Sequence, residues 1–119
     1  MSVLFYESKG QQAVLYNSKI FFFIQNNGCE YFDYDIIYSK TYKDVTGQVL
    51  CDNLAEQHRC TLSSKYTNKL RIVCDVTEYW LQSGYKPFKV AISIRDDDGK
   101  KKYTQVIPIK SSDHIPPIM

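Results

Sequence analysis

The chain has 119 residues, of which 44% are hydrophobic and 24% are charged. These are globular values, which exclude wholesale disorder, and the length suits one domain with its own core. The net charge is +2, and no apolar run is long enough to span a bilayer, which excludes a transmembrane helix.

The first part of the chain predicts a meander of β-strands. Aromatic and apolar residues favour strands in this order: 3–6, 13–16, 19–25 and 29–38. The strand at 19–25 is apolar almost throughout, which indicates burial on both faces. Lys9-Gly10 and Asn17-Ser18 supply turns, and Asn26-Asn27-Gly28 predicts a hairpin because Asn and Gly tolerate positive φ.

The middle of the chain predicts a short strand and then a helical turn. Thr46-Gly47 is a turn signal before the strand at 48–51. Asn53 and Glu56 have the spacing of a capping box, so a helical turn is expected over 54–58.

A strand at 69–74 is expected to lead into a helix at 76–83. Asp75 has the chemistry of an N-cap residue, and Gly84 is a natural residue to follow a helix. Within this helix one face is apolar, formed by Val76, Tyr79 and Trp80.

The last predicted element is a hairpin of two strands, 88–95 and 100–109, around a turn at 96–99. Alternation along the first strand predicts a buried face, made of Phe88, Val90, Ile92 and Ile94. The same alternation predicts a solvent face, made of Lys89, Ala91, Ser93 and Arg95. Pro108 predicts that the returning strand lies at a sheet edge.

Together these elements predict an α+β fold that is rich in β structure, with an antiparallel sheet and one or two short helices. Residues 1–110 are expected to form a single domain. Its first half is 3–61, and its second half, of strand, helix and hairpin, is 62–110. Residues 111–119, with Pro116-Pro117, are expected to form a C-terminal tail.

Charge is distributed unevenly between the halves. Residues 1–61 have a net charge of −2, and residues 62–119 have a net charge of +4. A nucleic-acid-binding surface concentrates positive charge where phosphates lie. One alternative is therefore a nucleic-acid interface on the final hairpin, formed by Lys89, Arg95, Lys100, Lys101 and Lys102.

The four cysteines allow three interpretations. They can be free thiols that pack as small apolar side chains, or one or two disulfides in an oxidising compartment. The third interpretation is a zinc site, because thiolate and imidazole are usual zinc ligands. Its candidate ligands are Cys51, His58, Cys60 and Cys74.

Catalytic motifs give little reason to expect an enzyme. The chain has no nucleophile elbow, phosphate loop or dinucleotide fingerprint. Asp33 and Asp35 could share a strand face as a carboxylate pair, and the aspartates at 96–98 could chelate a cation. Solvated strand and turn residues are the simpler interpretation of both groups. We expect no cofactor.

Residues 3–61 resemble a FLYWCH-type zinc-finger domain in the order of their motifs. The resemblance is carried by Phe5-Tyr6-Glu7-Ser8-Lys9-Gly10, Val14-Leu15-Tyr16, Ile20-Phe21-Phe22-Phe23 and His58-x-Cys60. Tyr34 and Tyr42 stand where that family has metal-binding cysteines, so the resemblance implies a derivative that has lost its metal. Family members are associated with DNA and chromatin, which implies a nuclear role.

We therefore expect a non-catalytic protein–protein interaction domain in the nucleus or cytoplasm, associated with chromatin and able to form a homodimer. Tyrosine is common at interfaces, and the chain has 10 tyrosines. The expected partner-binding residues are Tyr31, Tyr34, Tyr38 and Tyr42. The alternatives are the nucleic-acid interface above, or a secreted or viral interaction domain held by disulfides.

Overall fold

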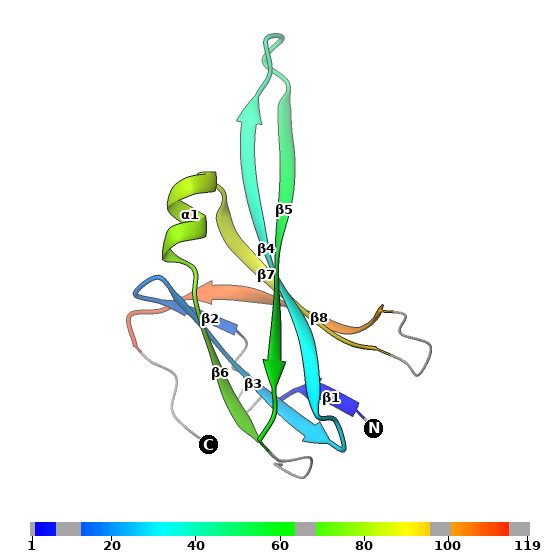
Figure 1. Ribbon diagram of the computed structural model, residues 1–119. Helices are drawn as coiled ribbons and strands as arrows, with labels where there is room; N and C mark the ends of the chain where they lie inside the picture. Colours follow the sequence, from blue (N-terminus) through cyan, green and yellow to red (C-terminus); the bar gives the residue numbers. More distant parts are fainter. Residues whose placement is uncertain (1, 7–12, 64–68, 96–100, 115–119) are drawn as a thin grey trace.

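The computed structural model describes residues 2–6, 13–63, 69–95 and 101–114 (Figure 1). Strands dominate these residues, and one helix accompanies them, so the expected β-rich character is confirmed. The elements are β1 (Ser2–Phe5), β2 (Ala13–Tyr16), β3 (Lys19–Asn27), β4 (Tyr31–Lys43), β5 (Val49–Thr61), β6 (Leu70–Asp75), α1 (Thr77–Ser83), β7 (Lys86–Arg95) and β8 (Lys101–Ser111). No helix in this part of the chain is long and apolar enough to cross a membrane.

The strands form two layers that are joined through β8. In the first layer β3 pairs with β6 along one edge, and with β2 and β1 along the other. In the second layer β4 lies between β5 and β7. β8 runs antiparallel to β7 and parallel to β2, so the sheet is mixed, whereas the sequence predicted an antiparallel one.

The core lies between the two layers. Five consecutive residues of β3, from Ile20 to Ile24, are buried, which confirms the predicted burial of both its faces. Phe22 links the layers, because its ring packs edge-on against Phe5 at 5.7 Å and against Tyr34 at 5.4 Å. Aromatic pairs in this arrangement add to the stabilisation that comes from burial alone.

Two of the predicted turns flank β3, and one of them joins different layers. Asn17 and Ser18 form the two-residue turn between β2 and β3, with φ of 52° and 61°. At Asn26-Asn27-Gly28 the chain does turn, with Gly28 at φ 91°, yet β3 and β4 do not pair. The predicted hairpin is therefore wrong. The Asn26 side chain instead bonds both backbone polar groups of Cys29, which stabilises a tight corner between the layers.

The predicted helical turn at 54–58 is also wrong, because these residues belong to β5. β5 pairs with β4 residue for residue, from Tyr31 opposite Thr61 to Lys43 opposite Val49. A ladder of this length satisfies the backbone groups of the whole segment, which outweighs a local capping preference. The turn predicted at Thr46-Gly47 is confirmed, with Gly47 at φ 85°.

Helix α1 forms where the sequence predicted it. Its N-cap residue is Val76 and not the predicted Asp75, and Gly84 ends it with φ of 70°. The Asp75 carboxylate accepts a hydrogen bond from the Thr77 backbone N–H at 2.9 Å. Val76 is fully buried, and Tyr79 and Trp80 pack against the core. The predicted apolar face of the helix is therefore confirmed.

The final hairpin is confirmed as β7 and β8, with two corrections. Ala91 and Ser93 are buried and do not form a solvent face, because both side chains are small and β7 is flanked by β4 and β8. Pro108 does not mark a sheet edge, since β8 lies between β7 and β2. It is the last residue paired with β7, and Ile109 is the first paired with β2.

Two predicted turns and the predicted C-terminal tail complete the comparison with the sequence. The turns at Lys9-Gly10 and 96–99 lie outside the described residues. Ser111 is the last residue of β8 and is not part of a tail, and the next residue, Ser112, donates its backbone N–H to the Leu15 carbonyl at 3.0 Å.

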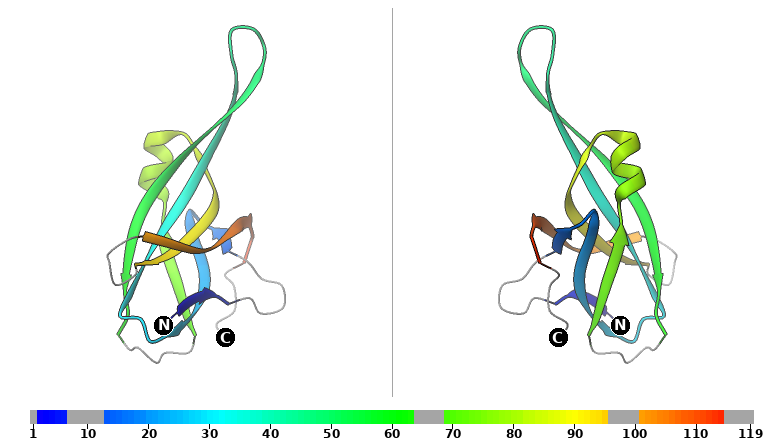
Figure 2. Two further views of the ribbon diagram at one scale, coloured as in Figure 1. Left: turned by 90° about the vertical axis from the view of Figure 1, so that its right-hand side faces the viewer. Right: turned by 90° about the vertical axis from the view of Figure 1, so that its left-hand side faces the viewer.

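The paired ends of β4 and β5 project from the body as a two-stranded ribbon, which we call the hairpin arm (residues 40–53). Figures 1 and 2 show it extending well beyond the other strands. The pairing of β4 with β7 ends at Ser39, so beyond that residue the two strands of the arm pair only with each other in the described structure.

The β2–β3 turn gives the first testable prediction. Ser18 adopts positive φ. This conformation is strained for a residue with a Cβ atom, whereas glycine adopts it without strain. We expect Ser18→Gly to raise the free energy of unfolding by about 0.5 kcal/mol, and Ser18→Val to lower it by about 1–2 kcal/mol. Urea denaturation measures both. Equal stability of the two variants would contradict the left-handed turn.

Candidate functional site

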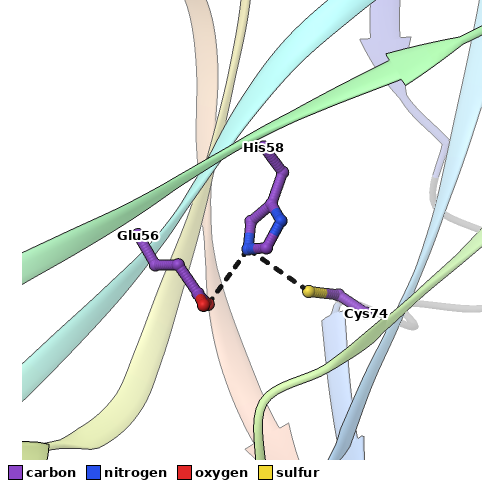
Figure 3. Close-up of side chains that lie close together, drawn as sticks. All are labelled: Glu56, His58 and Cys74. Atoms are coloured by element: carbon purple, nitrogen blue, oxygen red, sulfur yellow. Dashed lines mark hydrogen bonds and ion pairs between the residues drawn. The ribbon is translucent and has the colours of Figure 1, made fainter. Parts of the chain in front are cut away.

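A cluster of titratable side chains lies where the free edges of the two layers meet. We call it the seam cluster; it consists of Glu56 and His58 from β5 and Cys74 from β6 (Figure 3). Each of these strands ends its layer, since β5 pairs with β4 and β6 pairs with β3 among the described residues. The layers are therefore connected at this seam through side chains.

The period of two along each strand explains how the seam cluster forms. Glu56 and His58 are two residues apart on β5, so both side chains point to the same face. That face is the inner one, because the residues directly opposite them on β4, Ile36 and Tyr34, are buried. Cys74 is buried on the inner face of β6 and points toward them.

The three groups meet at a single nitrogen. His58 Nε2 lies 3.0 Å from Glu56 Oε1 and 3.6 Å from Cys74 Sγ. Tyr38 donates a hydrogen bond from its hydroxyl to the same carboxylate oxygen at 2.9 Å. The Tyr34 ring stacks on the imidazole, with centroids 4.9 Å apart and an interplanar angle of 16°.

This geometry does not suit a thiol nucleophile. A Cys–His–carboxylate relay needs the thiol at one ring nitrogen and the carboxylate at the other. Here both groups contact Nε2. Burial also raises the pKa of the Cys74 thiol to about 11, so the nucleophilic thiolate is scarce at neutral pH.

The seam cluster contains two of the four zinc ligands predicted from the sequence. His58 and Cys74 meet, whereas Cys51 lies on the exposed hairpin arm, where its Sγ is 3.2 Å from Ser39 Oγ. Cys60 lies next along the inner face of β5 and packs against the core. All four cysteines, with Cys29 in the core, are free thiols, so the structure contains none of the disulfides of the secreted alternative.

Sequence reasoning missed Glu56 as a site residue. The capping-box spacing placed it in a helix, where it would not share a face with His58. Read as one strand, the alternation Glu56-x-His58-x-Cys60 would have placed all three side chains together.

The four predicted partner-binding tyrosines do not share an exposed face. Tyr34 and Tyr38 are buried in the core, because even-numbered residues of β4 point inward as far as Tyr38. Tyr31 is partly buried beneath the Arg59 guanidinium, which lies 4.4 Å from its ring centroid. Tyr42 lies on the hairpin arm and is exposed.

The outer face of the second layer holds an ion-pair group around Asp33. Its carboxylate accepts hydrogen bonds from Arg59 at 2.9 Å and from Arg95 at 3.4 Å. The bond from Arg59 is the main reason that the pKa of Asp33 lies below its usual value. Asp35 is buried on the same face, so the two aspartates share a strand face as the sequence predicted. The Asp33 carboxylate, however, is paired with two arginines.

The structure describes the side chains of only some residues of the predicted nucleic-acid interface. Arg95 is paired with Asp33, and Lys89 is exposed. Lys100 lies outside the described residues, as do the side chains of Lys101 and Lys102. In the backbone ladder Lys101 is opposite Arg95 and Lys102 is opposite Ile94.

The hairpin arm exposes several apolar side chains. Val45 at its tip is fully exposed, and Val49 and Tyr42 are exposed on its two strands. Leu54, where the arm joins the body, is exposed as well. A shallow apolar hollow on the outer face of the second layer is lined by Asp35, Ile37, Asn53, Leu54, Ala55, Ala91 and Val106.

Comparison with known proteins adds no assignment. No protein-family model, curated protein or solved structure matches the chain. The FLYWCH-type resemblance therefore stays a prediction from the order of motifs, as do the nuclear and chromatin roles that it implies.

The environments of the thiols predict an order of reactivity. Cys51 is exposed, whereas Cys74 is buried and its pKa is raised to about 11. At pH 8 only about one Cys74 thiol in a thousand is ionised. We expect iodoacetamide to label Cys51 first and Cys74 only after urea is added, as measured by peptide mass mapping. Equal labelling rates in the folded protein would contradict the placement of β6.

The Asp33 ion pairs predict a pH-dependent stability. The folded-state pKa of Asp33 lies below its unfolded value, so its contribution is present above about pH 4 and is lost as pH falls further. We expect Asp33→Asn to cost about 1–2 kcal/mol at pH 7 and much less at pH 2. Urea denaturation at several pH values tests this. The exposed Asp113 provides the control, because Asp113→Asn is expected to change little at any pH.

Proposed function

We propose that this protein is a non-catalytic protein-binding domain that holds its partner with the hairpin arm and the adjacent free edge of β5. The observation that supports this most directly is the exposure of apolar side chains on the arm, away from the core. The proposal concerns the role alone, because the compartment was inferred only from the family resemblance.

The exposed arm is costly to maintain without a partner. A two-stranded ribbon in water has marginal stability, because it has no layer to pack against. Val45 and Val49 are exposed to water on this ribbon, and neither contributes to the core. Contact with a protein surface would remove these side chains from water and stabilise the arm.

The edge of β5 offers a second means of attachment. From Val49 to Ala55 this strand pairs only with β4 among the described residues, so its other edge presents backbone donors and acceptors. Such an edge can accept an added strand from another protein, with backbone hydrogen bonds supplying affinity.

A second copy of the chain is one partner that the arm can accept. Two β5 edges related by a twofold axis would pair antiparallel and extend the sheet across both copies. The charges on the arm allow this approach, because Lys40 and Lys43 balance Asp44 and Asp52. We therefore expect homodimerisation.

The dimer is the direct test of this proposal. We expect sedimentation velocity to show a concentration-dependent dimer, and Val49→Lys to weaken it at least tenfold, since the variant places a charge in an apolar contact. Leu81→Lys is the matched control, because Leu81 is also exposed but belongs to α1 and not to the arm. At concentrations low enough for the unchanged protein to be monomeric, both variants should unfold at nearly its temperature.

A monomeric protein would leave a different protein as the partner, which a second experiment can detect. Quantitative affinity purification should then recover proteins that bind the unchanged chain and the Leu81→Lys variant but not Val49→Lys. The proposal fails if neither a dimer nor any such protein is found. Binding to duplex DNA with a steep salt dependence would favour the nucleic-acid alternative instead.

A further inference from the structure

We propose that the seam cluster is a zinc site in which Glu56, His58 and Cys74 are the protein ligands. It would connect the edge strand of one layer to the edge strand of the other. This inference is independent of the protein-binding role, and its ligand set differs from the one predicted from the sequence, which included Cys51 and Cys60.

The separations of the donor atoms are close to those that a tetrahedral zinc ion requires. Zinc bonds of about 2.0–2.1 Å to nitrogen or oxygen and about 2.3 Å to sulfur separate neighbouring ligand atoms by roughly 3.3–3.6 Å. The two separations at His58 Nε2 are 3.0 Å to Glu56 Oε1 and 3.6 Å to Cys74 Sγ. All three donor atoms lie within 4.8 Å of one another, so shifts in side-chain torsions suffice to place an ion between them.

The types of donor select zinc among common ions. Magnesium and calcium prefer oxygen ligands, and one carboxylate would hold them weakly. Thiolate and imidazole together suit zinc, and a carboxylate is also an accepted zinc ligand. Three protein ligands leave one coordination position for water. Access is available, because the side chains of His58 and Glu56 are 27% and 21% exposed.

Neighbouring side chains already hold two of the ligands in place. The Tyr38 hydroxyl donates to the Glu56 carboxylate at 2.9 Å, and the Tyr34 ring stacks on the His58 imidazole. Groups that orient metal ligands in this way raise metal affinity. The ligands also lie on strands and not on loops, since Glu56 and His58 are within the β4–β5 ladder and Cys74 is within the β3–β6 ladder.

The first experiment measures metal binding directly on the full chain. We expect native mass spectrometry to show one zinc ion per chain after ZnCl₂ is added and excess metal is removed. We expect Co²⁺ in its place to give a thiolate-to-cobalt charge-transfer band and the visible spectrum of a four-coordinate ion. Absence of the charge-transfer band, or of any retained metal, would overturn the proposal.

Variants identify the ligands and separate this site from the one predicted from the sequence. Cys74→Ser should abolish the charge-transfer band, while Cys51→Ser and Cys60→Ser should keep it. Loss of the band in Cys60→Ser, or its survival in Cys74→Ser, would overturn the ligand assignment. Tyr38→Phe keeps all three ligands, and it should weaken zinc binding about 10-fold to 100-fold without removing the band.

Folding is checked separately, because Cys74 is buried. Glu56→Gln changes a partly exposed side chain and keeps its shape, so it should fold normally and bind zinc at least tenfold more weakly. Zinc should also raise the melting temperature of the unchanged protein and of Cys60→Ser, and should raise that of Glu56→Gln by clearly less at the same zinc concentration. An equal rise in all three would indicate binding elsewhere and would overturn the site.

Discussion

The residue-for-residue pairing of β4 with β5 is the constraint on which the rest of the molecule depends. Because side chains alternate along a strand, this register points Glu56 and His58 inward and Arg59 toward Asp33 on the outer face. The same pairing continues past the last contact with β7 and so produces the hairpin arm. A shift of one residue would exchange the inner and outer faces and remove the seam cluster and the Asp33 ion pairs together.

Most strands could be predicted from the sequence because their signals are local. The apolar run of β3, the Asn17-Ser18 turn and the capped helix α1 each depend on residues close together in the chain. The failures arose where pairing between distant residues decided the outcome. Asn53 and Glu56 have a helical capping pattern, but β4 supplies partners for the entire segment. Asn26-Asn27-Gly28 has hairpin chemistry, but its flanking strands pair with other strands.

The seam cluster could be predicted only in part for the same reason. The sequence identifies His58 and Cys74 as metal-binding residue types, yet it cannot show that β5 and β6 end separate layers whose edges face each other. The spacing of the cysteines also does not show which of Cys60 and Cys74 contacts His58, and in the structure it is the Cys74 thiol that lies next to the imidazole. Tyr34 and Tyr38 were expected on a binding surface because Tyr is common there, and the alternation along β4 buries them instead.

The position of β8 has a consequence for how the protein is made. It is the last of the described strands, and it alone pairs with both layers, through β7 and β2. As a nascent chain leaves the ribosome, the earlier strands can form local pairs, but the two layers gain their shared backbone connection only after β8 has emerged. Until then β2 and β7 both present open edges, at which unwanted strand pairing can begin.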